Sequence, residues 1–270
     1  MRYPAVAGRF YPSDRDELIS EIERCFAHPL GPGMISKRDG GRTIKGALVP
    51  HAGYACSGMN AAHAFRSIAE DGRPEAYIII GPDHYGIPFD SALCSEPYMS
   101  PLGECGIHED IAERLSETVA DSPLAHALEH SIEAEVPFIQ YIDPEAKIVP
   151  IIMHRQDIGF AEHIGKAIRE ACDGYDVVVI ASSDLSHYIP KDDAERLDSI
   201  LLDDMASLDT SRMYSSIRRY GISACGYGPI AAMISATRPD NCTVLKHTDS
   251  WDSIHYQRDA VVGYGSAVFR

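Results

Sequence analysis

Three apolar runs in this chain stop just before a histidine, and this pattern limits the folds that the chain can adopt. They are Gly46-Ala-Leu-Val-Pro50 before His51, Ala76-Tyr-Ile-Ile-Ile80 before His84, and Val177-Val-Val-Ile180 before His187. Runs of about four to eight apolar residues bounded by turn residues are typical of buried strands. Ligands of open α/β sheets bind beyond the carboxyl ends of such strands. We therefore expect three imidazoles to meet there, as a metal site needs.

Length and composition favour one globular domain over residues 1–270, because no linker, internal repeat or low-complexity segment divides the chain. No stretch of about 18 uncharged apolar residues occurs, and the first residues lack the apolar core of a secretory signal. We therefore expect a cytoplasmic protein without a membrane span. The formal net charge of −16 argues against nucleic acid as a partner. The cysteines form no C-x-x-C pair, which favours reduced thiols.

Segments with strand and helix patterns alternate along the chain. Strands are predicted at 45–50, 78–80, 90–94, 147–153, 176–182, 242–247 and 260–269. Helices are predicted from 13, at 57–70, 108–120, 130–142 and 158–172, within 192–220, and from 226, with loops at 28–42 and 95–106. This alternation predicts a three-layer α/β/α domain with a mainly parallel central sheet. The last two strands can pair as an antiparallel edge.

His51 and His84 form the strongest candidate pair for metal binding. Each lies just past a predicted strand beside glycine or proline, where side chains point into a cleft. Neutral imidazole is a favoured ligand for zinc, copper and iron. The alternative is that each histidine only bonds a carbonyl near its strand end.

Asp184 and His187 lie three residues apart after the third strand. On a helical turn they would share a face, and the carboxylate would then fix the tautomer of the imidazole. Such a pair suits a general acid or base as well as a metal ligand. The alternative is that Asp184 caps the segment that follows.

His130 and Glu133 have an H-x-x-E spacing at the start of a predicted helix, which would place both side chains on one face. Paired metal sites on helices use this spacing in duplicate, whereas here it occurs once. We therefore expect a buried, hydrogen-bonded pair that supports the cleft from behind the ligands.

Cys225 is the cysteine whose setting points to function. It precedes an apolar helix and is followed by Gly226. The positive end of a helix lowers the pKa of a nearby thiol, so this cysteine is a candidate thiolate ligand or nucleophile.

Six motifs occur in the same order as in a known family, the Memo family. They are Ala7-Gly-Arg-Phe-Tyr-Pro12, Pro50-His-Ala-Gly-Tyr54, Gly81-Pro-Asp-His84, His130-Ser-Ile-Glu-Ala-Glu-Val-Pro-Phe138, Ser182-Ser-Asp-Leu-Ser-His187 and Ala224-Cys-Gly226. The resemblance covers nearly the whole chain. The founding member of the family is named as a mediator of cell motility driven by an ErbB-type receptor.

The resemblance implies a fold similar to the class III extradiol dioxygenases, which hold non-haem iron. It implies that His51 and His84 bind the metal, that Cys225 is the third ligand, and that His187 has the position of the acid or base. Prokaryotic relatives are similar to one component of the AmmeMemoRadiSam set, with a radical-SAM protein and an AMMECR-type protein. The eukaryotic relative is associated with phosphopeptide binding and with copper or iron.

Two positions depart from the related patterns. Asp83 and Tyr85 flank His84 where many relatives carry serine and a second histidine, so an extra carboxylate is expected near the metal. Cys225 takes the place of the carboxylate that completes the dioxygenase site. A soft thiolate favours Cu(I), zinc or thiolate-bound iron, which weakens the case for ring cleavage.

Three functions remain open from the sequence. The first is a metal-binding protein with iron or copper, acting as a redox enzyme in which His187 and Asp184 move the proton. The second is a hydrolase with a zinc-activated water. The third is a module that binds a peptide or protein and keeps only a structural or vestigial metal site.

Overall fold

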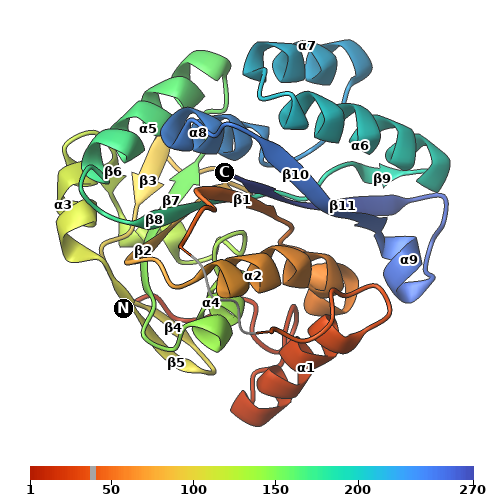
Figure 1. The fold of residues 1–270 in the computed structure, drawn as a ribbon, viewed down its shortest axis with the longest axis horizontal. Coiled ribbons are helices and arrows are strands. Elements are labelled where there is room, and N and C mark those ends of the chain that lie inside the picture. The colour runs from red at the N-terminus through yellow and green to blue at the C-terminus, as the bar shows by residue number, and fades with distance from the viewer. Residues whose placement is uncertain (37–40) are drawn as a thin grey trace.

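Four parallel strands form the centre of the sheet in this computed structural model, which describes residues 1–36 and 41–270. In spatial order they are β1 (Gly46–Val49), β8 (Val177–Ser182), β2 (Ala76–Pro82) and β7 (Lys147–Met153) (Figure 1). Every residue of β1 and β2 is buried, as expected for parallel strands that are covered on both faces. The carboxyl ends of the four parallel strands lie at one end of the sheet, and a site is expected at that end.

Antiparallel strands flank this parallel centre. The full order is β10-β11-β1-β8-β2-β7-β3-β6 in an 11-stranded sheet. The remaining strands are β3 (Ser91–Leu93), β4 (Tyr98–Ser100), β5 (Gly103–Ile107), β6 (Ala120–Asp121), β9 (His187–Ile189), β10 (Cys242–Asp249) and β11 (Val261–Phe269). The predicted pairing of the last two strands is confirmed, with β10 at the edge and β11 between β10 and β1.

Helices cover both faces of the sheet (Figure 1). On one face lie α3 (Glu109–Ser116), α5 (Ile158–Ala171), α6 (Lys191–Ala206), α7 (Thr210–Tyr220) and α8 (Tyr227–Thr237). On the other lie α1 (Arg15–Ala27), α2 (Met59–Asp71), α4 (Val136–Ile142) and α9 (Ser250–Ile254). The predicted three-layer α/β/α architecture is confirmed.

Three predicted segments differ from the structure. The predicted loop at 95–106 contains the hairpin β4–β5, and β5 also pairs with β7. The helix predicted at 130–142 begins only at Val136, because Pro137 is tolerated only in the first turn of a helix. A π-helical turn over Tyr54–Gly58 precedes α2. Of the predicted loop at 28–42, residues 37–40 lie outside the described residues.

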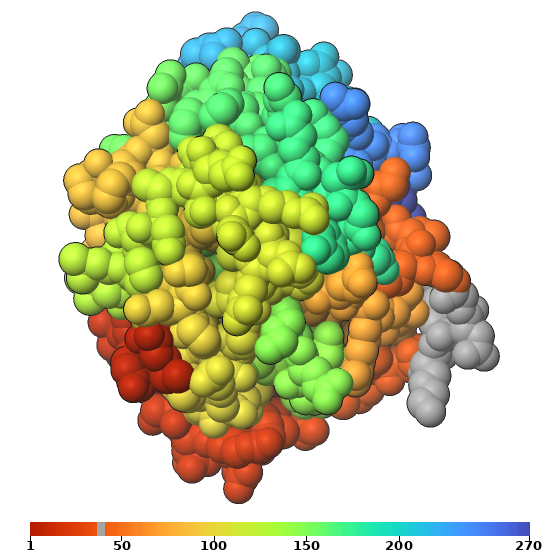
Figure 2. All heavy atoms as spheres, turned by 90° about the vertical axis from the view of Figure 1, so that its left-hand side faces the viewer, coloured from red at the N-terminus to blue at the C-terminus, as the bar shows by residue number. Residues whose placement is uncertain are grey.

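The N-terminal residues are built into the domain. Figure 2 shows them in dark red beside the yellow segment that contains β4. The backbone N–H of Arg2 donates to Pro97, and Met99 donates back to the carbonyl of Arg2. Arg2 itself is 3% exposed and reaches into the interior. Within residues 1–36 and 41–270, no helix is long and apolar enough to cross a membrane.

Candidate metal centre

His51 is fixed by the end of β1 and by the loop after β8. Its side chain is buried, with the residue 1% exposed. The backbone N–H donates to Oδ1 of Asp184 at 2.9 Å, and Nδ1 lies 2.7 Å from Oγ of Ser182. Because Nδ1 is occupied, Nε2 is the atom that faces the site.

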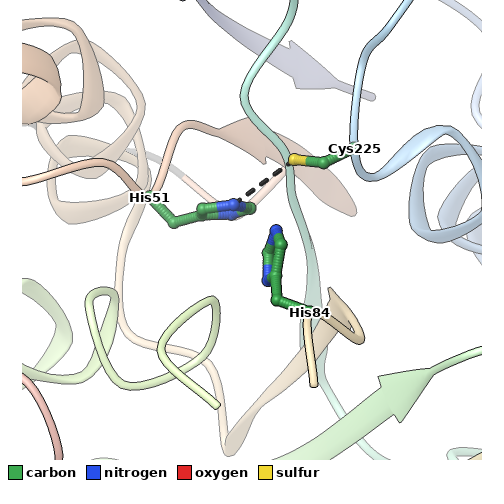
Figure 3. A group of neighbouring side chains, drawn as sticks. All are labelled: His51, His84 and Cys225. Carbon is green, nitrogen blue, oxygen red and sulfur yellow. Dashed lines mark hydrogen bonds between the residues drawn. The ribbon is translucent and has the colours of Figure 1, made fainter. Parts of the chain in front are cut away.

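His84 follows β2 and is held by Glu129, a residue not singled out in the sequence. The two oxygens of Glu129 accept from the backbone N–H of His84 at 2.7 Å and bond its Nδ1 at 2.9 Å. Figure 3 shows the ring of His84 pointing toward His51 and Cys225. A carboxylate bonded to one ring nitrogen is the usual support of a metal-binding histidine, because it fixes the tautomer and orients the ring.

Cys225 reaches the same point from the segment before α8. Its Sγ lies 3.4 Å from Nε2 of His51 and accepts from the backbone N–H of Asp184 at 3.3 Å (Figure 3). The segment fits there because the next residue is glycine. A Cβ on Gly226 would lie 2.4 Å from the carbonyl oxygen of Ser182.

The three side chains have the spacing that a shared ion requires. One ligand atom from each of His51, His84 and Cys225 lies within 4.8 Å of the others. Bond lengths of about 2.0 Å to nitrogen and 2.3 Å to sulfur put the two ligands of a tetrahedral ion about 3.5 Å apart. The 3.4 Å between Nε2 of His51 and Sγ of Cys225 fits this value. The donor set of two imidazoles and one thiol therefore fits a transition metal.

Burial and nearby charges together set the pKa values of the two imidazoles. Burial lowers the pKa of His51 well below the ordinary value, with further lowering from His130 and His84. Burial also lowers the pKa of His84, but the hydrogen bond and charge of Glu129 outweigh it and leave that pKa raised. The neutral ring of His51 keeps a lone pair available for a metal.

The expected low pKa of Cys225 is wrong for the metal-free protein. Burial raises the pKa of the thiol, and the nearby charge of Asp184 raises it further. The beginning of α8 does not compensate for these two effects. A bound cation would reverse this balance, because a coordinating thiol is deprotonated by the ion.

The predicted pair of His130 and Glu133 does not form. The carboxylate of Glu133 accepts from the hydroxyl of Tyr11 at 2.6 Å and forms a buried ion pair with Arg2. The reason is that both residues lie before α4, His130 in irregular backbone and Glu133 in a turn, so a spacing of three does not place them on one helix face. Glu133 therefore anchors the N-terminal segment.

His130 nevertheless lies at the centre. Its ring stacks on that of His84, with centroids 4.5 Å apart, and meets the edge of His51 at 5.5 Å. His84, Glu129 and His130 form a second group of potential ligand atoms within 4.8 Å of one another. Glu129 already accepts from the backbone N–H groups of His130 and Ser131. Its oxygens are therefore occupied by hydrogen bonds to His84 and to this backbone segment.

Asp184 and His187 both lie near the centre, but the predicted hydrogen bond between them is absent. His187 lies on β9 and its Nδ1 bonds the carbonyl oxygen of Ser223 at 3.0 Å. Asp184 instead accepts from the backbone of His51 and Ala52. Burial raises the pKa of Asp184 to about 6, although the charge of His187 lowers it. The extended backbone of β9 removes the shared face that a helical turn would have provided.

Asp83 shapes the loop beside the centre, and its charge contributes to the raised pKa of His84. Its oxygens accept from the backbone of Tyr85, Gly86 and Ile87. One of them also bonds Nδ1 of His154 at 2.8 Å. These contacts occupy the carboxylate.

Comparisons with known proteins find relatives over nearly the whole chain. The family profile described as "Memo-like protein" matches residues 2–268. The chain is 40% identical to "MEMO1 family protein MK0963" of Methanopyrus kandleri, covering 100% of this chain and 99% of the relative. It is 41% identical to "MEMO1 family protein MTH_45" of Methanothermobacter thermautotrophicus, covering 98% of each.

A solved structure shares the fold. It is described as the crystal structure of uncharacterized protein JW3007 from Escherichia coli K12, with a TM-score of 0.56 and 10% sequence identity. The match covers 84% of this chain and 100% of that chain. At this identity the likeness concerns the fold alone.

Proposed function

The chain belongs to the Memo family, and from this premise we propose that it is a metal-binding protein in which His51, His84 and Cys225 hold one ion of iron or copper. The observation that carries the proposal is the convergence of their ligand atoms within 4.8 Å. These residues come from three loops far apart in the chain, and each has its own support. Shared coordination of one ion accounts for this convergence.

We propose further that the centre belongs to a redox enzyme. Iron or copper, when bound, would supply electron transfer or activation of a bound molecule. The half-buried imidazole of His187 is the group that would move a proton, since its charge acts on both His51 and Asp184. Asp184 would position His51 and the backbone N–H that faces Cys225.

A hydrolase with zinc is the second candidate. Three protein ligands leave a fourth position open, which is the arrangement of catalytic zinc sites. His84 is the most exposed of the three residues, so that position would face solvent. Zinc in the isolated protein together with turnover of a simple ester or phosphoester would favour this candidate over the redox enzyme.

A ligand of the centre would have an apolar part. A hollow of about 360 Å³ is lined mostly by apolar side chains, several of them from the loop that follows His84. Its lining includes Tyr85, Phe89 and Leu128, and the ring of Tyr85 lies 6.4 Å from that of His130. A small molecule or an apolar peptide side chain fits this hollow, and a binding module without catalysis would use the same surface. The family resemblance adds radical-SAM and AMMECR-type proteins as candidate partners, and we propose the cytoplasm as the compartment.

The metal content of the purified protein tests the proposal. We expect about one equivalent of iron or copper in protein prepared without added metal, and a large loss in Cys225→Ala. Cys242→Ala is the matched control, because Cys242 is also a half-buried free cysteine but lies at the start of β10. Equal metal in both variants would contradict the proposed ligand set.

A further inference from the structure

A buried polar chain leads away from His51 on the side opposite to Cys225. Nδ1 of His51 lies 2.7 Å from Oγ of Ser182, and that oxygen lies 2.9 Å from Oε1 of Glu135. The same hydroxyl lies 2.6 Å from the carbonyl oxygen of Ser131. None of these four residues is more than 1% exposed. Bulk solvent does not reach these groups, so protein groups must supply the hydrogen-bond donors of the cluster.

The Ser182 hydroxyl has one proton and three short contacts. A serine hydroxyl donates once and accepts twice, and a carbonyl oxygen only accepts. The proton of Ser182 therefore goes to Ser131, and the other two contacts must be donated to Ser182. His51 donates one of them from Nδ1–H. Glu135 can donate the other only if its carboxyl group carries a proton.

An ionised Glu135 would leave one contact without a proton. The carboxylate and the carbonyl of Ser131 would compete for the single proton of Ser182, and two oxygens would then face each other at 2.6 or 2.9 Å. Unpaired buried polar groups are costly. The number of available donors therefore favours the protonated form of Glu135, and this argument does not depend on a pKa.

Burial of Glu135 outweighs the hydrogen bond of Ser182, which by itself would favour the ionised form. Glu129 and Glu133, on the same segment, are paired with His84 and Arg2. Glu135 forms no ion pair among the residues that the structure describes, and its carboxyl group makes no cap hydrogen bond to α4. The charged group that faces it is Asp184, and together with burial it raises the pKa of Glu135. The buried hydroxyl of Tyr54 is also close enough to interact with it.

We propose that Glu135 is held in the folded protein as a neutral carboxylic acid, and that through Ser182 it fixes His51 in the Nδ1–H tautomer. The lone pair of Nε2 then faces Cys225 and the metal position. Glu135 is a positioning residue, since it acts on His51 through Ser182. The consequence for metal binding rests on the proposed function, whereas the protonation of Glu135 does not.

Infrared spectroscopy of the metal-free protein tests the protonation directly. We expect a band of a protonated carboxylic acid near neutral pH that disappears in Glu135→Gln. The matched control is Glu117→Gln, which removes an exposed carboxylate from the C-terminal end of α3. A spectrum in which Glu135→Gln removes only ionised carboxylate would overturn the proposal, whether or not the protein binds a metal.

The pH dependence of unfolding gives an independent test. A group whose pKa is raised by folding contributes its full stabilisation at pH values below its pKa in the unfolded chain. This contribution is lost as the pH rises toward the pKa of the group in the folded protein. Relative to Glu135→Gln, the unfolding constant of the wild type should therefore increase about tenfold per pH unit above pH ~5. A ratio that does not change with pH would show that Glu135 is ionised when folded.

The tautomer of His51 shows whether Glu135 positions that ring or only fills space in the interior. Nitrogen NMR of the metal-free protein should show one Nδ1–H tautomer in the wild type. Glu135→Gln should keep it, because the amide N–H₂ also donates to Ser182, whereas Glu135→Leu and Ser182→Ala should give a mixture of tautomers. A single unchanged tautomer in a folded Glu135→Leu variant would overturn the positioning role.

Discussion

The close approach of Gly226 to the end of β8 positions the sulfur of Cys225, so Gly226→Ala should damage stability and metal binding together. The added Cβ would lie 2.4 Å from the carbonyl oxygen of Ser182, about 1 Å short of ordinary contact. It would also lie 2.6 Å from Cβ of Ser183, whose hydroxyl accepts from the N–H of Gly226 at 2.8 Å. Neither the strand end nor the segment before α8 can move away without breaking this hydrogen bond.

The expected cost follows from these contacts. Overpacking of this kind costs about 1–3 kcal/mol, and the lost hydrogen bond adds about 1 kcal/mol. We therefore expect the free energy of unfolding to fall by about 2–4 kcal/mol in urea denaturation. A displacement of the sulfur by about 1 Å should also weaken metal binding by at least about tenfold, as changes around metal ligands do.

Gly159→Ala is the matched control for this substitution. The new Cβ would lie in α5 at an ordinary distance of 3.5 Å from Asp157. Because Gly159 is the second residue of α5, we expect a gain of no more than about 0.5–1 kcal/mol from helix propensity and no change in metal content. If Gly226→Ala matched the wild type in both stability and metal content, the geometric account of Cys225 would be refuted.

Three further predictions concern the surroundings of the centre. His126 is buried, which lowers its pKa to about 4. Between pH ~6.5 and pH ~4 the unfolded chain therefore binds a proton that the folded protein does not. Relative to His126→Gln, the free energy of unfolding of the wild type should fall by about 2 kcal/mol between neutral pH and pH ~5 in urea titrations. Arg2→Met should cost about 3–5 kcal/mol because Glu133 would remain buried without a cation, and Glu133→Gln in the same chain should recover part of this loss. Glu129→Gln should lower metal affinity about 10–100-fold in metal titrations, with unchanged circular dichroism, because the ring of His84 loses its carboxylate.

The strands of the central sheet could be predicted because their burial leaves continuous apolar runs. The same runs end at His51 and His84, so the position of both histidines beyond the carboxyl ends followed from the sequence. The position of Cys225 beside these histidines was predicted only from the family resemblance. The residues around Cys225 in the sequence do not determine its distance from β1. Its raised pKa could not be predicted, because burial by distant residues outweighs the local helix end.

The supporting residues could not be predicted from spacing. The choice of Glu133 as the partner of His130 assumed a helix, although Pro137 already indicated that the helix begins later. Glu129 orients His84 across 45 residues of chain, and no periodicity reports such a contact. The pairing of Asp184 with His187 failed for a similar reason, since the short β9 forms only by pairing with β11.

X-ray absorption at the edge of the bound metal tests the ligand set most directly. Metal-loaded wild type should give two nitrogen neighbours at about 2.0 Å and one sulfur neighbour at about 2.3 Å, and only the sulfur should vanish in Cys225→Ser. A first shell without sulfur in the wild type, or one that Cys225→Ser leaves unaltered, would contradict the proposed centre.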